Sequence, residues 1–303
     1  MTNLLSFVGN TPLINIPHKY SPNVSLFAKL EWFNPTGSVK DRAAKAIIES
    51  GLESKALVNK ILIDATSGNT GISYAAFGGN LTIPVELALP ENASPERKHI
   101  LTQYGAKLHL TSPMEGTDGA QRFVQELVNK YPDRYFYPDQ YNNDNNWRAH
   151  FETTGPEIWR QTEETVTHFV AGLGTSGTLI GTTKYLQPKG VHCVSVQPDN
   201  PMHGLEGWKH MQTAVVPGIY NAALADEEMT VSTELSFSYA RAATRFLGLH
   251  LSPSSAANLL AAMTVVKRLD SGTVVTVFPD NAMKYLQDSF WSDDSYLIEN
   301  PFR

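Results

Sequence analysis

The sequence predicts an α/β protein built from two doubly wound, mostly parallel sheets with helices on both faces. Three observations lead to this fold class. Apolar, β-rich segments alternate with helical segments, the alternation restarts after a polar stretch, and glycine-rich loops follow several of the expected strands. This order of segments is typical of βαβ units on a parallel sheet.

The first half of the chain begins with a strand-like run at residues 25–33. Three strands and three helices then alternate. The strands are expected at residues 60–65, 84–90 and 106–112, and the helices at residues 71–79, 96–105 and 119–131.

The pattern restarts after the asparagine-rich stretch 139–150. The expected order is then a helix at 153–161, a strand at 167–174, a helix at 178–186, a strand at 192–198, a further helix and a last strand at 274–279. We therefore expect two domains, residues 1–145 and 146–303. The cleft between two such domains is the default position of an active site.

Composition limits the classes of partner. The chain has 303 residues and a net charge of −6, and its basic residues are scattered singly. It therefore lacks the basic patch that attracts nucleic acids or anionic membranes. No segment is long enough to span a bilayer, and the N-terminus lacks the features of a signal peptide. We expect a cytoplasmic protein with small-molecule ligands, no nucleic-acid partner and no membrane partner.

Cysteine usage limits the chemistry further. Cys193 is the only cysteine, so the chain can form neither an intramolecular disulfide nor a cysteine-rich metal site, and no metal is expected. Its position in the apolar segment 192–198 predicts a buried strand cysteine rather than a reactive thiol.

The first candidate loop, residues 67–71, follows an expected strand and leads into a helix. Its small residues let backbone N–H groups approach an anion at the helix N-terminus. Asn69 and the hydroxyls of Ser67 and Thr70 add side-chain donors, which suits a carboxylate. A simple helix cap is the alternative.

The second candidate loop, residues 172–178, also joins a strand to a helix. Backbone amides, hydroxyls and the helix dipole could cradle a phosphate there. Gly172, Gly174 and Gly177 also form a G-x-G-x-x-G pattern with Asp199 past the next strand, so a dinucleotide-binding domain is a rival interpretation. No lysine follows the last glycine, which excludes a Walker A loop.

Two further segments carry candidate side chains. Pro253 forbids a regular helix before Ser254, which places Ser254 or Ser255 near a helix N-cap. Capping explains one hydroxyl, not two. Lys40 follows the strand-like run, where the structural alternative is an exposed helix lysine paired with Asp41 or a neighbour.

Six motifs together resemble the cysteine synthase family. They are "GNTPL" (9–13), "NPTGSVKDR" (34–42), "ATSGNTG" (65–71), "TTGPEIW" (153–159), "GLGTSGT" (172–178) and "PGIYN" (217–221). They occur in register across nearly the whole chain, and the match is closest to the B-type, CysM-like O-acetylserine sulfhydrylases. The family consists of pyridoxal-phosphate enzymes of fold type II, the tryptophan synthase β-like fold that includes cystathionine β-synthase. The resemblance implies a homodimer with the cofactor between the two domains.

The resemblance also implies a role for each candidate residue. Lys40 would form the Schiff base with pyridoxal 5'-phosphate, Asn69 would hydrogen-bond its phenolic oxygen, and Ser254 would face its pyridine nitrogen. The residues implied to hold the cofactor phosphate are Gly174, Thr175, Ser176, Gly177 and Thr178. The residues implied to bind the substrate carboxylate are Ser67, Gly68, Thr70 and Gln140.

The chemistry implied is β-replacement on an activated L-serine. A primary amine such as Lys40 forms an imine that the substrate amine displaces, and the freed amine then acts as general base at the substrate Cα. A neutral serine at the pyridine nitrogen withdraws electrons weakly, which favours loss of a β-leaving group over transamination. A sulfide or other sulfur donor would attack the resulting aminoacrylate and give L-cysteine.

The choice of substrate and the roles of several residues stay open. Ala256 and the segment Asp280–Asn281 differ from many relatives, and no role is assigned to Asp280 or Asn281. Within residues 202–211, Lys209 lies where O-phosphoserine-using relatives carry a phosphate-binding arginine. The alternative is a solvated helix face with a Glu206–Lys209 pair, while Trp208 and His203 shape the pocket or only pack.

Three alternatives to the cysteine synthase interpretation are kept. The first is a related β-replacement with another nucleophile or leaving group. The second, of a different reaction class, is a nicotinamide-dependent oxidoreductase built on residues 172–177. The third is a non-catalytic binding protein that keeps the fold, against which an intact Lys40 argues.

Overall fold

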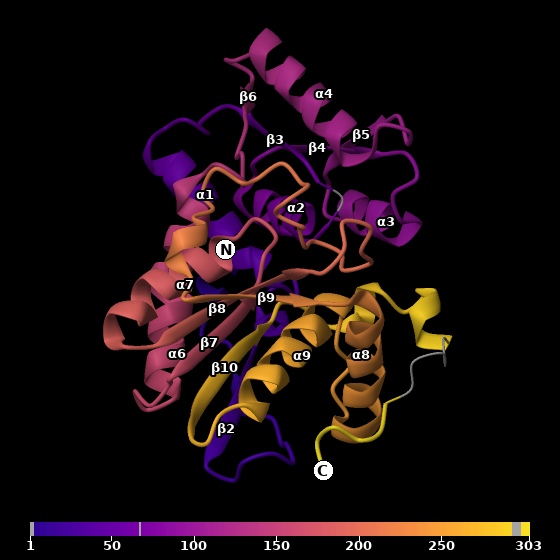
Figure 1. Ribbon diagram of the computed structural model, residues 1–303. Coiled ribbons are helices and arrows are strands. Elements are labelled where there is room, and N and C mark those ends of the chain that lie inside the picture. The colour runs from indigo at the N-terminus through magenta and orange to yellow at the C-terminus, as the bar shows by residue number, and fades with distance from the viewer. Residues whose placement is uncertain (1–2, 67, 293–297) are drawn as a thin grey trace. The chain divides into compact units, whose positions relative to one another are not determined.

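The chain forms two compact α/β units in a computed structural model that describes residues 3–66, 68–292 and 298–303. The first unit comprises Met1–Val8, Asn34–Thr36 and Lys40–Asn146, and the second comprises Gly9–Phe33, Gly37–Val39 and Trp147–Arg303 (Figure 1). Each unit has its own sheet. The α/β fold class predicted from the sequence is confirmed.

The sheet of the first unit has four strands in the order β5-β4-β3-β6, and all neighbours run parallel. The strands are β3 (Ile61–Ala65), β4 (Val85–Pro90), β5 (Lys107–Thr111) and β6 (Tyr135–Phe136). The helices are η1 (Leu4–Phe7), α1 (Lys40–Glu53), α2 (Asn69–Leu81), α3 (Pro95–Gln103) and α4 (Gly116–Lys130).

Alternate strand residues of this sheet face opposite layers of helices. Leu62 and Leu87 belong to a cluster with apolar residues of α1, α2 and α3. Their chain neighbours Ile63 and Ala88 pack instead with Ala120 and Val124 of α4. Because side chains alternate along a strand, each face of the sheet is buried by different helices.

The sheet of the second unit has six strands in the order β1-β2-β10-β7-β8-β9. Only the β1–β2 pair is antiparallel. The strands are β1 (Leu13–Asn15), β2 (Val24–Leu30), β7 (His168–Gly172), β8 (His192–Pro198), β9 (Glu227–Val231) and β10 (Gly272–Phe278). The α-helices are α6 (Gly155–Gln161), α7 (Gly177–Leu186), α8 (Thr233–Leu247) and α9 (Pro253–Lys267).

Shorter helices complete the description. The 3-10 helices of the second unit are η2 (Glu31–Phe33), η4 (Gln187–Lys189), η5 (Ala222–Leu224), η6 (Ala282–Lys284) and η7 (Ser289–Ser292). Along the chain, the boundary between the two units falls within helix α5 (Asp144–Ala149). This helix continues into a π-helical turn, η3 (His150–Thr154).

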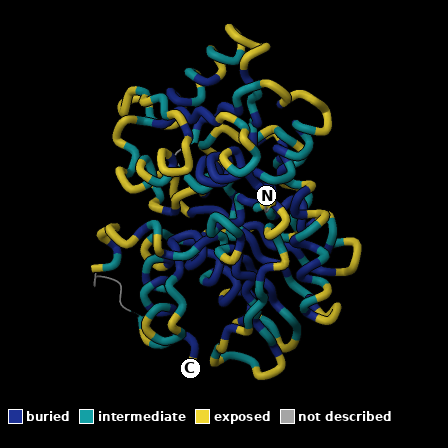
Figure 2. The backbone as a smooth tube through the Cα atoms, turned by 180° about the vertical axis from the view of Figure 1, so that it is seen from behind, coloured by how far each residue is buried: buried dark blue, intermediate teal, exposed yellow. Residues whose placement is uncertain are grey.

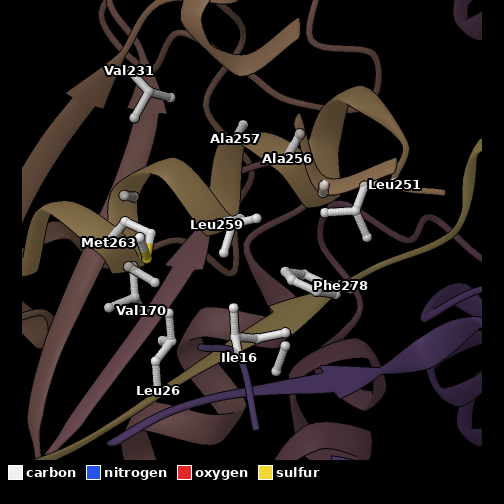
Figure 3. Close-up of a cluster of buried hydrophobic side chains, with 14 of the residues drawn as sticks. Ile16, Leu26, Val170, Val231, Leu251, Ala256, Ala257, Leu259, Met263 and Phe278 are labelled. Atoms are coloured by element: carbon white, nitrogen blue, oxygen red, sulfur yellow. The ribbon is translucent and has the colours of Figure 1, made fainter. Parts of the chain in front are cut away.

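Helices α8 and α9 cover one face of the second sheet. In Figure 3, Leu259 and Met263 project from α9 toward Val170, Leu26 and Ile16. The opposite face, which includes Phe169 and Cys193, packs against α6 and α7. Buried residues, dark blue in Figure 2, run through the interior of each unit, and exposed residues concentrate in its outer loops.

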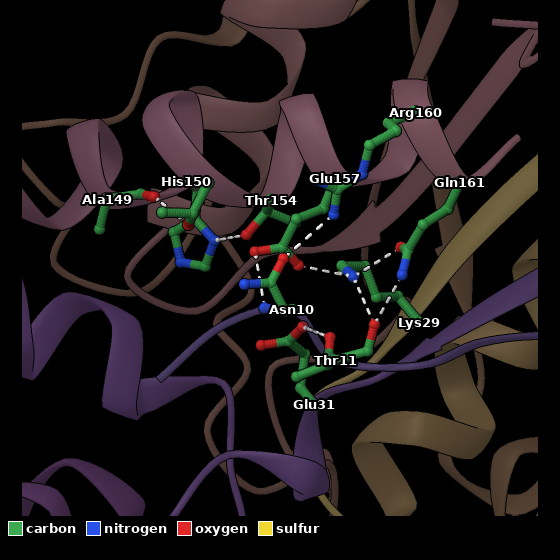
Figure 4. Close-up of polar contacts among 11 residues, drawn as sticks. Asn10, Thr11, Lys29, Glu31, Ala149, His150, Thr154, Glu157, Arg160 and Gln161 are labelled. Atoms are coloured by element: carbon green, nitrogen blue, oxygen red, sulfur yellow. Dashed lines mark hydrogen bonds and ion pairs between the residues drawn. The ribbon is translucent and has the colours of Figure 1, made fainter. Parts of the chain in front are cut away.

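A buried ion pair anchors α6 to the N-terminal part of the second unit (Figure 4). The Lys29 ammonium lies 2.7 Å from the Glu157 carboxylate and also donates to the carbonyl of Thr11 and to Gln161. The backbone N–H of Asn10 donates to Glu157 as well. Hydrogen bonds to several partners offset the cost of burying both charges.

The structure groups residues 9–33 with the second unit, whereas the predicted division at residue 145 counted them with the first domain. The reason is that β2 pairs along its whole length with β10, which lies far away in sequence. Residues 31–33, expected to continue the strand, form η2 instead. None of the helices in the described part of the chain is both long and apolar enough to cross a membrane.

Candidate active site

Lys40 is the first residue of α1, and the next residue fixes the start of this helix. The buried Asp41 carboxylate accepts hydrogen bonds from the Thr36 backbone N–H at 2.7 Å, from the Thr36 hydroxyl, and from the Ser73 hydroxyl at 2.6 Å. Ser73 lies in the second turn of α2 and also contacts the carbonyl of Asn69. Asp41 therefore links the helix start that carries Lys40 to the helix start that carries Asn69.

The loop before α2 presents helix N–H groups without a side-chain cap. The N-cap residue is Gly68, which has no side chain to accept from them. The interpretation of this loop as a simple side-chain cap therefore does not hold at the N-cap position. Ser67, which we expect to bind substrate, lies outside the described residues.

Thr70 and Gln140 are brought together from distant parts of the sequence. Both are buried, and the Thr70 hydroxyl donates to Gln140 Oε1 at 2.9 Å. The backbone carbonyl of Gln140 is held in turn by Asn146 at 2.7 Å. With its oxygen held by Thr70, the Gln140 side chain presents its Nε2 amide group as a hydrogen-bond donor.

The second glycine loop has the backbone of an anion site. Ser176, the residue before α7, has a positive φ of 67° and makes no side-chain cap. A non-glycine residue in the left-handed region turns successive N–H groups to one side and forms a concave nest for anions. Thr175, Ser176 and Gly177 are buried.

The segment 205–209 lies directly against this loop. A Cβ atom at Gly174 would lie 2.1 Å from the carbonyl oxygen of Gly207, so only glycine fits there. The backbone N–H of Lys209 donates to the carbonyl of Leu173 at 2.8 Å. The phosphate-loop candidates and residues 205–209 therefore form one continuous surface within the second unit.

Ser254 joins the same surface, but not as a helix cap. The N-cap of α9 is Ser252, whose hydroxyl accepts from the Ser255 N–H, and Pro253 is the first helical residue. Ser254 and Ser255 therefore lie near the N-cap, as predicted, but neither is the capping residue, because proline fits well at the first helical position and leaves the cap to Ser252. The Ser254 hydroxyl instead donates to the Glu206 carbonyl at 2.7 Å.

The segment 202–211 contains turns and no helix, so the helix face proposed for Glu206 and Lys209 is wrong. The Lys209 ammonium donates to the carbonyl of Val215 at 3.2 Å. Trp208 is buried in the core of the unit, whereas His203 is half-buried, and burial together with His210 lowers its pKa.

Asp280 and Asn281 now have structural contacts. The Asp280 carboxylate accepts from the Tyr285 hydroxyl at 2.9 Å, and its carbonyl accepts from Ser255 at 2.6 Å. The Asn281 side chain caps η6 by accepting from the N–H of Met283. Both residues therefore stabilise the turn after β10.

Burial strongly perturbs two titratable groups. Asp64 is the last residue but one of β3, and desolvation raises its pKa to about 7. Burial likewise raises the pKa of the Cys193 thiol to about 12, which confirms a buried, unreactive strand cysteine. Among the described residues, no group of three or more His, Cys, Asp or Glu side chains could hold a metal ion.

Four polar residues near the candidate site carried no assigned role in the sequence. They are Thr36, Asp41, Ser73 and His150. Thr36 and Asp41 lie within the motif around Lys40, which is a signal that could have drawn attention to them. Ser73 and His150 gave no such signal, because their contacts are made across helices.

Comparisons with known proteins agree with this arrangement. The family model described as "Pyridoxal-phosphate dependent enzyme" matches residues 4–280. A cysteine synthase of Aquifex aeolicus is 47% identical over 96% of this chain and 92% of its own length. Cysteine synthase B of Escherichia coli is 35% identical over 98% of both chains.

A solved structure gives the same result. The cysteine synthase of Entamoeba histolytica superposes with a TM-score of 0.94 and 30% identity, covering 99% of this chain and 93% of that one. These relatives favour a pyridoxal-phosphate enzyme over the nicotinamide-dependent oxidoreductase. The chain therefore belongs to the cysteine synthase family of pyridoxal-phosphate dependent enzymes.

Proposed function

We propose that this enzyme makes L-cysteine by β-replacement on O-acetylserine, with sulfide as the sulfur donor, and that O-phosphoserine is the second-choice substrate. The observation that carries this proposal is the paired helix start at Lys40 and Asn69, fixed by the buried Asp41 carboxylate. It supplies an amine and an amide donor on a rigid support, as the relatives' chemistry requires.

The residues of this chain fit pyridoxal phosphate. The nest around Ser176 suits a phosphate, and the neighbouring α7 N-terminus adds a favourable dipole. Gly174, Thr175, Ser176, Gly177 and Thr178 would hold the phosphate. Lys40 would hold the aldehyde carbon and Asn69 the phenolic oxygen. Ser254 would turn its hydroxyl hydrogen from the Glu206 carbonyl toward the pyridine nitrogen. When bound, the cofactor withdraws electrons from the substrate Cα.

The Lys40 amine would move the substrate's Cα proton. An amine released from its bond to the cofactor stands next to Cα and accepts this proton as a general base. Because Ser254 is uncharged, it stabilises a protonated pyridine less than a carboxylate would. This favours departure of the leaving group from Cβ over transamination.

The substrate carboxylate would bind at the start of α2. Gly68 and Thr70 would contribute backbone N–H groups, Ser67 a hydroxyl and Gln140 its Nε2 amide. The support for this assignment is the Thr70–Gln140 hydrogen bond, which orients the amide. The Lys209 ammonium contacts a backbone carbonyl, and this favours acetate over phosphate as the leaving group, since a dedicated phosphate ligand would face the substrate.

The test is the rate of cysteine formation from sulfide with each ester. We expect kcat/KM to be higher for O-acetylserine than for O-phosphoserine. In Lys40→Ala, kcat should fall by about 10²- to 10⁴-fold, the usual contribution of a general base. Faster turnover of O-phosphoserine, or full activity in Lys40→Ala, would contradict the proposal.

We also propose that the enzyme works as a cytoplasmic homodimer, as the family resemblance implies. Sedimentation of the purified protein at micromolar concentration gives the mass directly, and a mass near twice 33.4 kDa is expected. Fractionation of the native cell, with the protein tracked by antibody, tests the location. A monomer, or recovery outside the cytoplasmic fraction, would overturn the respective part.

A further inference from the structure

A buried histidine lies between two threonines, one of them in the candidate phosphate loop. His150 is only 2% exposed. Its Nδ1 lies 2.8 Å from the Thr154 hydroxyl, as Figure 4 shows, and its Nε2 lies 3.3 Å from the Thr178 hydroxyl. The imidazole therefore bridges the two hydroxyls.

The π-helical turn η3 carries one side of this bridge. His150 is its first residue and Thr154 its last. Turns of this kind are rare, insert an extra residue into a helix and often occur at functional sites. Here the turn puts the ring of the first residue within reach of the hydroxyl of the last.

Close helix packing brings Thr178 to the other side of the ring. A Cβ atom at Gly181, one turn after Thr178 in α7, would lie 2.0 Å from the carbonyl oxygen of Trp147 and 2.7 Å from the Cβ of His150. Only glycine at position 181 lets α7 approach the turn so closely. The Thr178 hydroxyl is thereby held next to the imidazole.

The hydrogens in this chain of contacts can be assigned from the chemistry of the ligand. A threonine hydroxyl has one hydrogen to donate, and phosphate oxygens accept hydrogen bonds. If Thr178 donated to His150, it could not also donate to a phosphate. The hydroxyl serves a phosphate only when His150 carries a hydrogen on Nε2 and donates it to Thr178. Nδ1 of the neutral ring then accepts from Thr154.

We propose that His150 is a positioning residue for the cofactor phosphate, which acts by holding the Thr178 hydroxyl with its hydrogen directed at that phosphate. The order of donation is Thr154 to Nδ1, Nε2 to Thr178, and Thr178 to the phosphate. This inference rests on the proposed role of Thr178 in the cofactor site. It assigns a function to the π-helical turn, which also joins α5 to α6.

The matched pair His150→Gln and His150→Met tests the proposal. Glutamine places an amide donor near the position of Nε2, whereas methionine has similar length and no donor. The measurement is the dissociation constant of pyridoxal phosphate from each apo-protein, obtained by fluorescence titration. We expect His150→Met to bind about 10-fold more weakly than wild type, the effect of one lost hydrogen bond, and His150→Gln to stay within about 3-fold of wild type.

The same titration in a Thr178→Val background separates positioning from structural damage. If His150 acts through the Thr178 hydroxyl, His150→Met should cause no further loss once that hydroxyl is gone. Equal losses in the glutamine and methionine variants, or an undiminished loss in the Thr178→Val background, would overturn the proposal. An unchanged affinity in Thr178→Val alone would overturn it by removing Thr178 from the phosphate site, without affecting the cysteine synthase proposal, which turnover tests separately.

The wild-type holoenzyme offers a readout that needs no variant. In protein labelled with ¹⁵N-histidine, the two ring nitrogens have widely different chemical shifts when only one carries a hydrogen. We expect His150 to be the neutral Nε2–H form with pyridoxal phosphate bound. The Nδ1–H form would contradict the proposed order of donation.

Discussion

Asp64 carries a buried carboxyl group just before the loop that leads to Asn69. Its Oδ1 accepts from the Ala65 N–H at 2.7 Å. Within the described part of the chain, Asp64 Oδ2 and the hydroxyl of Tyr74 are buried without a hydrogen-bond partner. Burial raises the pKa of Asp64 to about 7 and, helped by the charge of Asp64, raises the pKa of Tyr74 as well. The neutral form of this carboxyl suits the folded protein best.

Asp64→Asn should therefore change how stability depends on pH. In the unfolded chain the carboxyl ionises near pH 4, whereas in the folded protein it keeps its proton up to about pH 7. Between these values the folded state binds more protons, so the free energy of unfolding falls as pH rises. Urea unfolding at several pH values should show Asp64→Asn gaining stability relative to wild type, on the order of 1 kcal/mol per pH unit in this window.

The gain should level off above about pH 7, where both states of the wild type are ionised. Asp133→Asn, at an exposed position, is the matched control and should show no comparable trend. A constant difference between Asp64→Asn and wild type from pH 4 to 8 would contradict the raised pKa of Asp64.

Single residues differed in how well the sequence predicted their contacts. The burial of Cys193 follows from its apolar neighbours, and its strand position is local information. The contact of Thr70 with Gln140 joins residues 70 positions apart, so no local pattern contains it. Pro253 placed the helix start near Ser254, and its preference for the first helical position indicates Ser252 as the N-cap.

At the scale of elements, the start of α1 depends on the start of α2. The Asp41 carboxylate is fully buried and holds Thr36 on one side and Ser73 on the other. A buried carboxylate with several donors is stable only while those donors stay in place. We infer that Lys40 and Asn69 keep their spacing because this carboxylate connects their helices.

Asp41→Asn should loosen this connection. The amide replaces one acceptor oxygen with a donor, which then faces the Thr36 N–H or the Ser73 hydroxyl and leaves a buried polar group unpaired. We expect the free energy of unfolding to fall by about 2 kcal/mol in urea, and kcat to fall with it. Asp133→Asn again serves as the exposed control, and an Asp41→Asn variant as stable as wild type would contradict this role.

Elements with a strong apolar pattern were predicted well, and those without one were missed. The strands β3, β4, β5, β7 and β8 lie within the predicted segments, and β10 begins two residues before its predicted segment. The edge strand β9 was missed because its sequence, Glu227–Val231, is largely polar and half exposed. The turn η3 was not predicted, because it depends on the packing of α7 rather than on local propensity.

At the scale of the whole molecule, chain order and spatial grouping differ. Residues 9–33 belong with the second unit because β1 and β2 complete a sheet whose remaining strands begin at residue 168. Strand pairing over such a distance depends on the complete fold, and a single sequence contains no direct record of it. The fold class was predictable because it rests on the order of elements, whereas the division into units rests on which strands pair.

Chemical trapping tests whether Lys40 forms the imine with pyridoxal phosphate. Borohydride reduces an imine between a lysine and pyridoxal phosphate to a stable amine, and mass spectrometry then identifies the modified peptide. We expect the purified protein to be yellow and the pyridoxyl group to be found on Lys40. A colourless protein that pyridoxal phosphate cannot reconstitute, or a label on a different lysine, would contradict it.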